Sequence, residues 1–136
     1  MPRLSPDGHW LAYQSNESGT FEIYVRPFPG PGGKVQVSSG IGVEPLWGAS
    51  GRMLYYRTGR DVIGVPVTTG ASLTLGERKV VLTGDFLQNP SHPNYDVSPD
   101  GSEFLMMRRA GEDVLTIVVH NWAREVAAKT SGQPVR

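Results

Sequence analysis

A ten-residue pattern, in which a turn is followed by an apolar run, occurs three times in this chain of 136 residues. Its copies span residues 4–13, 47–56 and 97–106, and their turn glycines are Gly8, Gly51 and Gly101, about 43 and 50 residues apart. A repeat of this length indicates a chain built from equivalent supersecondary units. The repeat therefore predicts three copies of one small unit.

Each unit is predicted to be a sheet of short strands. In the turn Ser-Pro-Asp-Gly, Pro presets φ, Asp accepts a backbone hydrogen bond two residues on, and Gly adopts positive φ. The apolar runs that follow the turns are of strand length and are expected to be buried on both faces. They span residues 10–13, 53–56 and 104–107.

A second hairpin is expected after each apolar run. It leads into the strands expected at residues 21–26, 62–67 and 114–120. A fourth, outer strand is expected at residues 34–38 and again near residues 79–83, whereas the third unit offers none. A four-stranded unit repeated every 40 to 50 residues is typical of β-propeller blades, so the fold class predicted is all-β, a partial β-propeller of about three blades.

The expected domain is a single half-propeller over residues 1–129. Its blades are placed at about residues 1–38, 39–84 and 85–122. Asn121 is a suitable N-cap for a short helix over residues 122–129, and residues 130–136 have no packing pattern and are expected to be disordered.

Composition excludes several partners. Lys and Arg number 13, as do Asp and Glu, so there is no basic excess for nucleic acid. No apolar run is long enough to insert into a membrane, and the N-terminus lacks the hydrophobic stretch of a signal peptide, which predicts a cytoplasmic protein as written. There is no cysteine for disulfides or thiolate chemistry.

Residues 5–19 and 22–30 resemble the TolB-like, WD-type propeller repeats of bacteria. With residues 95–101 and 116–122, they are similar to the C-terminal sensor propellers of bacterial serine/threonine protein kinases. The resemblance covers about residues 3–125 and implies a propeller fold, an extracytoplasmic location of the parent domain and a sensing or scaffolding role. No kinase motif is present in the chain.

Closed rings of this family have six or more blades, whereas three are read here. A half ring would expose apolar faces and strand edges to water, which favours self-association. The prediction is a homodimer related by a two-fold axis that forms a six-bladed ring. A three-bladed monomer with frayed ends is the alternative.

Polar residues before two innermost strands are the candidate site. When Trp47 is aligned with Val97, Glu44 and Asn94 become equivalent, and both are expected at the mouth of the central channel. Doubled by a two-fold axis, they would form an oxygen-rich set for a divalent cation such as Ca²⁺. His92 and Asp96 are the candidate catalytic bases beside it. The alternative is that Glu44 is a solvated carboxylate and Asn94 a turn residue.

Two functions remain open. In the first, the chain is a non-catalytic module whose channel or rim loops bind a small molecule, a peptide or a protein, with Tyr95, Asn94 and Glu44 as ligand-binding residues. In the second, it is a hydrolase, metal-dependent and promiscuous toward esters or phosphotriesters, with its site at the channel mouth. No cofactor other than such a cation is indicated.

Overall fold

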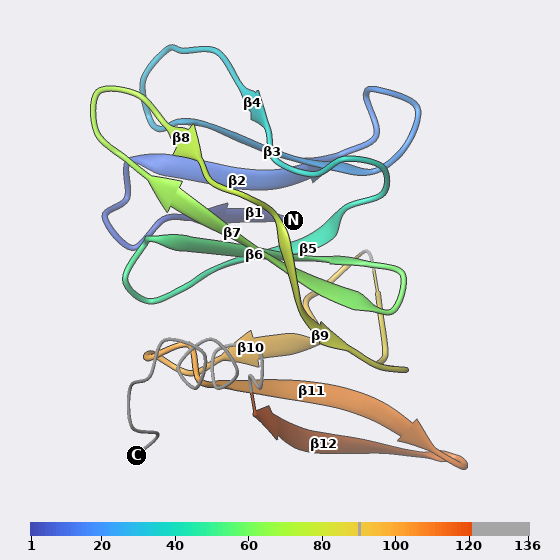
Figure 1. Cartoon of the computed structure of the whole chain (residues 1–136). Coiled ribbons are helices and arrows are strands. Elements are labelled where there is room, and N and C mark those ends of the chain that lie inside the picture. Colours follow the sequence, from blue (N-terminus) through green and yellow to red (C-terminus); the bar gives the residue numbers. More distant parts are fainter. Residues whose placement is uncertain (90, 121–136) are drawn as a thin grey trace.

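The computed structural model describes residues 1–89 and 91–120, and within them the chain forms twelve strands in three antiparallel sheets (Figure 1). The strands are β1 (Pro2–Leu4), β2 (Trp10–Ser15), β3 (Glu22–Pro27), β4 (Val35–Gln36), β5 (Val43–Trp47), β6 (Met53–Thr58), β7 (Asp61–Thr68), β8 (Thr74–Leu75), β9 (Lys79–Thr83), β10 (Tyr95–Val97), β11 (Glu103–Ala110) and β12 (Asp113–His120). The fold is all-β and consistent with a partial β-propeller. The helix expected at 122–129 and the tail at 130–136 lie outside the described residues.

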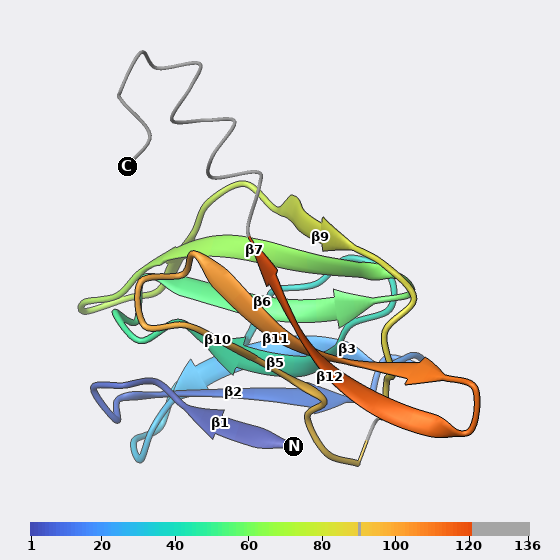
Figure 2. The same cartoon turned by 90° about the horizontal axis from the view of Figure 1, so that it is seen from below.

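Each sheet is a meander that runs from its innermost to its outermost strand. The first sheet has the order β1-β2-β3-β4, and the third has the order β10-β11-β12. In the second sheet, β7 pairs with β8 near one end (Figure 1) and with β9 near the other (Figure 2), so two strands share its outer edge. The outer strand expected near 79–83 is β9. Strand β8 was not expected, because two residues are too few to give a strand pattern in the sequence.

The hairpin turns form as their residue types predict. Gly8 has φ 75° and its N–H donates to Ser5 O at 2.8 Å, while Asp7 Oδ1 accepts from His9 N at 3.0 Å. The third sheet repeats this turn, with Gly101 at φ 74° and Asp100 Oδ1 accepting from Ser102 N. These turns hold the first two strands of a sheet in register.

Two apolar cores lie between the sheets. The first lies between the first and second sheets, and the second lies between the second and third. Strand β6 contributes to both, because Leu54 and Tyr56 point to one side and Tyr55 to the other. The second sheet is therefore covered on both faces (Figure 1).

The expectation that all three apolar runs are buried on both faces was wrong for the outer sheets. In β2, Ala12 is buried but Leu11 and Tyr13 are only partly so, and in β11 Phe104 is buried while Leu105 is 46% exposed. The reason is position in the stack, since each outer sheet has only one described neighbour. Within the described residues there is no helix of the length and hydrophobicity that crossing a membrane requires.

Candidate functional site

The structure brings three of the five predicted site residues together. Glu44 lies in β5, Tyr95 is the first residue of β10, and Asn94 immediately precedes it, so the contact joins the first strands of the second and third sheets. Asn94 Nδ2 donates to Glu44 Oε1 at 2.9 Å, and the Tyr95 hydroxyl donates to Glu44 O at 2.8 Å. All three residues are buried.

The Glu44 carboxylate is fully buried and accepts hydrogen bonds on both oxygens. Oε1 accepts from Asn89 N at 3.1 Å as well as from Asn94, and Oε2 faces Arg57 Nη1 at 3.4 Å. Glu44 has φ 54°, at a register shift between Val43 and Leu46. A bulge of this kind redirects a side chain, and here it points the carboxylate at the loop that leads into β10.

Arg57 is the residue of this cluster that the sequence did not single out. It is 1% exposed, and its guanidinium also donates to Leu87 O and, at 3.2 Å, to Phe86 O. Its Nε has no partner among the described residues. The available signal was strand alternation, since Met53, Tyr55 and Arg57 share one face of β6. Together, Glu44 and Arg57 fasten the loop before β10 to the second sheet.

Burial raises the pKa of the Tyr95 hydroxyl well above its ordinary value, and the nearby Glu44 carboxylate raises it further. The phenol therefore stays protonated at neutral pH and acts as a hydrogen-bond donor.

His92 and Asp96 lie apart from this buried cluster. Both side chains are exposed. The His92 ring contacts Asn89 Nδ2 through Nε2 at 3.0 Å, and Asp96 lies on the opposite face of β10 from Tyr95, where its Oδ1 accepts from Val97 N at 2.9 Å. Among the described hydrogen bonds none joins either side chain to Glu44. Their catalytic role stays a prediction.

Metal binding by Glu44 and Asn94 also stays a prediction. The described ranges 1–89 and 91–120 contain no cluster of three or more His, Asp or Glu side chains that would hold a metal ion. The predicted ligand set draws on two copies of the chain, whereas each Glu44 carboxylate already has donors within its own chain.

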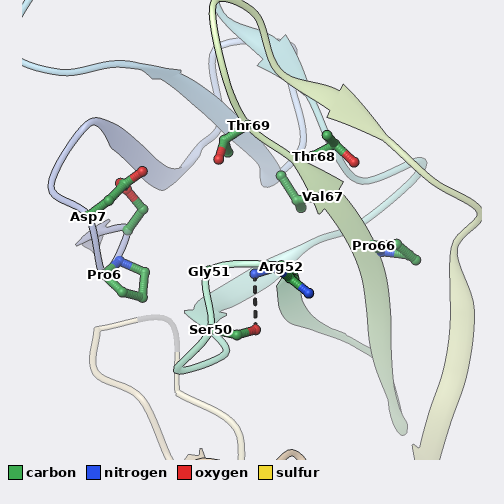
Figure 3. Close-up of a pocket in the computed structure, with 10 residues that line it drawn as sticks. Pro6, Asp7, Ser50, Gly51, Arg52, Pro66, Val67, Thr68 and Thr69 are labelled. Atoms are coloured by element: carbon green, nitrogen blue, oxygen red, sulfur yellow. Dashed lines mark hydrogen bonds between the residues drawn. The ribbon is translucent and has the colours of Figure 1, made fainter.

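A groove of about 870 Å³ lies elsewhere, between the first and second sheets (Figure 3). Two turns form it, the β1–β2 turn with Pro6 and Asp7 and the β5–β6 turn with Arg52. The end of β7 closes it, with Val67 and the residues around it. We call this the turn groove. Its lining residues are Ser5, Pro6, Asp7, Ser50, Gly51, Arg52, Pro66, Val67, Thr68 and Thr69.

The turn groove combines both charges with an apolar wall. Hydrogen bonds from the Ser5 hydroxyl and from His9 N–H lower the pKa of Asp7, so its carboxylate is ionised at neutral pH. Arg52 contributes a cation from the opposite turn, and Val67 points from β7 toward the two turns (Figure 3). Pro66 also lines the groove. From the sequence, Asp7 and Arg52 were placed in turns and residues 62–67 in a strand, and none of them was assigned to a site. The repeat alignment could have indicated the groove, because equivalent turns of adjacent sheets lie at the same end of the stack.

Comparisons with known proteins identify no family. No family model matches the chain, and no curated protein matches it. Among solved structures, the chain is similar to TolB from Acinetobacter baumannii, with 14% sequence identity and a TM-score of 0.43 over 88% of this chain. The chain spans 40% of the length of that TolB chain. The description of the fold therefore rests on the sheets themselves.

Proposed function

We propose that the chain is a β-propeller module that self-associates and binds a small molecule or a peptide. The observation that carries the proposal is the turn groove, whose volume of about 870 Å³ lies in the range of small-molecule sites. Such sites pair apolar walls with a few fixed polar groups. Here the fixed groups lie on hairpin turns that their own hydrogen bonds hold in place.

The lining chemistry favours a ligand that carries both charges. Asp7 attracts an ammonium group, Arg52 attracts a carboxylate, and the hydroxyls of Thr68 and Thr69 offer further hydrogen bonds. Pro66 and Val67 would pack against an aliphatic part. A free amino acid or a short peptide carries an ammonium group, a carboxylate and, in many cases, an aliphatic side chain.

The test is titration of the ¹⁵N-labelled protein with the free amino acids and a set of di- and tripeptides, followed by NMR. The expected result is a saturable shift of the amide signals of Gly8, Arg52 and Thr69 with at least one probe. Asp7→Asn is expected to weaken that probe's binding about tenfold or more, because it removes the charge that holds the ammonium group.

Asp100→Asn is the matched control. Asp100 occupies the equivalent turn position in the third sheet and makes the same kind of hydrogen bond, but it does not line the turn groove. Loss of binding in both variants would mean that the turn matters only structurally. Absence of any saturable shift at the groove would contradict the proposal, and hydrolysis of an ester or phosphotriester probe would favour the enzymatic alternative.

A further inference from the structure

Two sheet faces carry apolar side chains that no other described sheet covers. One is the face of the third sheet with Leu105 (46% exposed) and Val118 (57% exposed), which are cross-strand neighbours. The other is the face of the first sheet with Leu11 and Tyr13, beside Leu4. We call these the third-sheet outer face and the first-sheet outer face. Exposed apolar patches on sheets mark interaction surfaces.

The repeat shows what the third-sheet outer face is suited to contact. Counted from the turn glycines, Leu105 occupies the position of Ala12 in the first sheet and of Tyr55 in the second. Ala12 and Tyr55 are 0% and 4% exposed, because each faces the next sheet along the chain. Leu105 therefore lies where a fourth sheet would pack.

The first-sheet outer face is suited to contact the sheet that would precede it in a stack. Leu11 occupies the position of Leu54 in the second sheet and of Phe104 in the third. Both of these are 0% exposed, because each faces the preceding sheet. The two outer faces of the described stack are thus the complementary halves of the interface that occurs twice between the described sheets.

Charges at equivalent positions are complementary as well. Glu103, on the third-sheet outer face, takes the position of Trp10, while Arg26, the cross-strand neighbour of Leu11, takes the position of Val65. Trp10 and Val65 belong to the same buried core between the first and second sheets. Two apolar positions of one buried core are therefore occupied by an acid on one outer face and a base on the other.

The third-sheet outer face also has a cavity beside Glu103, where the Arg26 side chain of a second copy would insert. A cavity of about 210 Å³ is lined by Asp96 and Glu103, with Leu105 and Val118 beside them. Among the described residues, the Glu103 carboxylate forms one ion pair, with the exposed His120 ring, in which Oε1 lies 3.4 Å from Nδ1. Two carboxylates at the rim of an apolar hollow suit a guanidinium on a long aliphatic stem.

We propose that the third-sheet outer face of one copy docks on the first-sheet outer face of a second copy, with Arg26 of one chain paired to Glu103 of the other. This inference rests on the proposed function, since it specifies how the module self-associates. Two copies close a ring of six sheets, within the four to eight blades of known propellers, whereas three copies would give nine. The contact is head-to-tail and occurs twice around the two-fold axis.

Light scattering coupled to size exclusion measures the mass directly. The expected mass is twice the 14.8 kDa of one chain. Glu103→Arg and Arg26→Glu are each expected to weaken the dimer at least tenfold, and the double variant is expected to restore it, because the pair is re-formed with reversed charges. Glu112→Arg, a reversal at an exposed acid in the β11–β12 turn, should leave the mass unchanged.

A covalent test does not depend on how these variants fold. Because the chain has no cysteine, Glu103→Cys combined with Arg26→Cys places the only two thiols at the proposed contact. Oxidation should give a disulfide-linked dimer, whereas Glu112→Cys with Arg26→Cys should not. A monomeric wild type, a ladder of larger masses, or a dimer indifferent to Glu103→Arg and to Leu105→Glu would overturn the proposal.

The two proposals can fail separately. A monomer that still shows probe-dependent shifts at Gly8 and Arg52 would overturn the docking and the self-association, and would leave the ligand-binding part of the proposed function standing. A dimer that responds to Glu103→Arg but binds no probe would confirm the docking and contradict the ligand site.

Discussion

Glu44 and Arg57 form a buried ion pair in the middle of the chain. Their side chains are 0% and 1% exposed, and between them they hold backbone groups of Phe86, Leu87 and Asn89. Removing one member of a buried pair leaves an uncompensated charge. This pair is therefore a point at which the chain is sensitive to single substitutions.

Arg57→Ala is expected to lower the free energy of unfolding by about 3–5 kcal/mol, because it leaves the buried Glu44 carboxylate without its cationic partner. Urea denaturation followed by circular dichroism measures the loss. The control is Arg60→Ala, which breaks an exposed pair with Asp85 at 2.7 Å and should cost under about 1 kcal/mol. Equal losses in the two variants would show that the buried Glu44–Arg57 pair contributes no more to stability than an exposed pair.

The raised pKa of Tyr95 makes the stability of the folded chain depend on pH in the alkaline range. Because burial raises its pKa in the folded chain, the unfolded chain loses the phenolic proton first. Stability from this group is complete below about pH 10 and declines as pH rises above that value. Tyr95→Phe should cost about 1 kcal/mol at neutral pH, by losing the hydrogen bond to Glu44 O.

The measurement is a series of urea titrations between about pH 8 and pH 11. The difference in stability between the wild type and Tyr95→Phe should shrink and then change sign as pH rises. A difference independent of pH would contradict the buried donor role.

At the scale of elements, the passage from the first sheet to the second is tightly packed. Gly42 N donates to Phe21 O at 2.8 Å, and a Cβ at Gly42 would lie 2.6 Å from Ser38 Cβ. Ser38 is itself buried, and its hydroxyl accepts from Ile23 N at 2.8 Å and donates to Glu22. The two sheets are thus joined without room for a side chain.

Gly42→Ala is therefore expected to destabilise the chain by about 1–3 kcal/mol, because the new methyl group must displace a buried hydroxyl. Thermal denaturation compares it with Gly70→Ala, where a Cβ would meet nothing within 4 Å. An alanine tolerated equally at both positions would mean that the connection can shift.

At the scale of the whole molecule, the stack of three sheets has one covered sheet and two half-covered ones (Figure 1). Folding buries the core residues of β6 on both sides, but it leaves Leu105 and Val118 partly in contact with water. If a second copy covers these faces, stability depends on protein concentration.

The midpoint of thermal unfolding is accordingly expected to rise with concentration, by several degrees between about 1 and 100 µM. Leu105→Glu should abolish that dependence with little effect at the lowest concentration, because Leu105 is half-exposed in the single chain. Differential scanning calorimetry at matched concentrations measures the midpoint. A wild-type midpoint that does not change with concentration would contradict assembly.

The local structure could be predicted from the sequence because its signals are local. Turn chemistry at Asp7-Gly8 and Asp100-Gly101, apolar runs of strand length and their repetition are sufficient for an all-β chain of three sheets. They also placed Glu44 near Asn94, since equivalent positions of adjacent units lie close together.

What only the tertiary structure decided is which polar groups are buried and which faces are open. Glu22 alternates with apolar residues as if exposed, yet it is buried, and Ser38 donates a hydrogen bond to it from the next segment. The Glu44–Arg57 pair, the separation of His92 and Asp96 from it, and the turn groove likewise depend on contacts between sheets. A strand pattern specifies two faces, but burial depends on what packs against each face, and that neighbour is far away in the sequence.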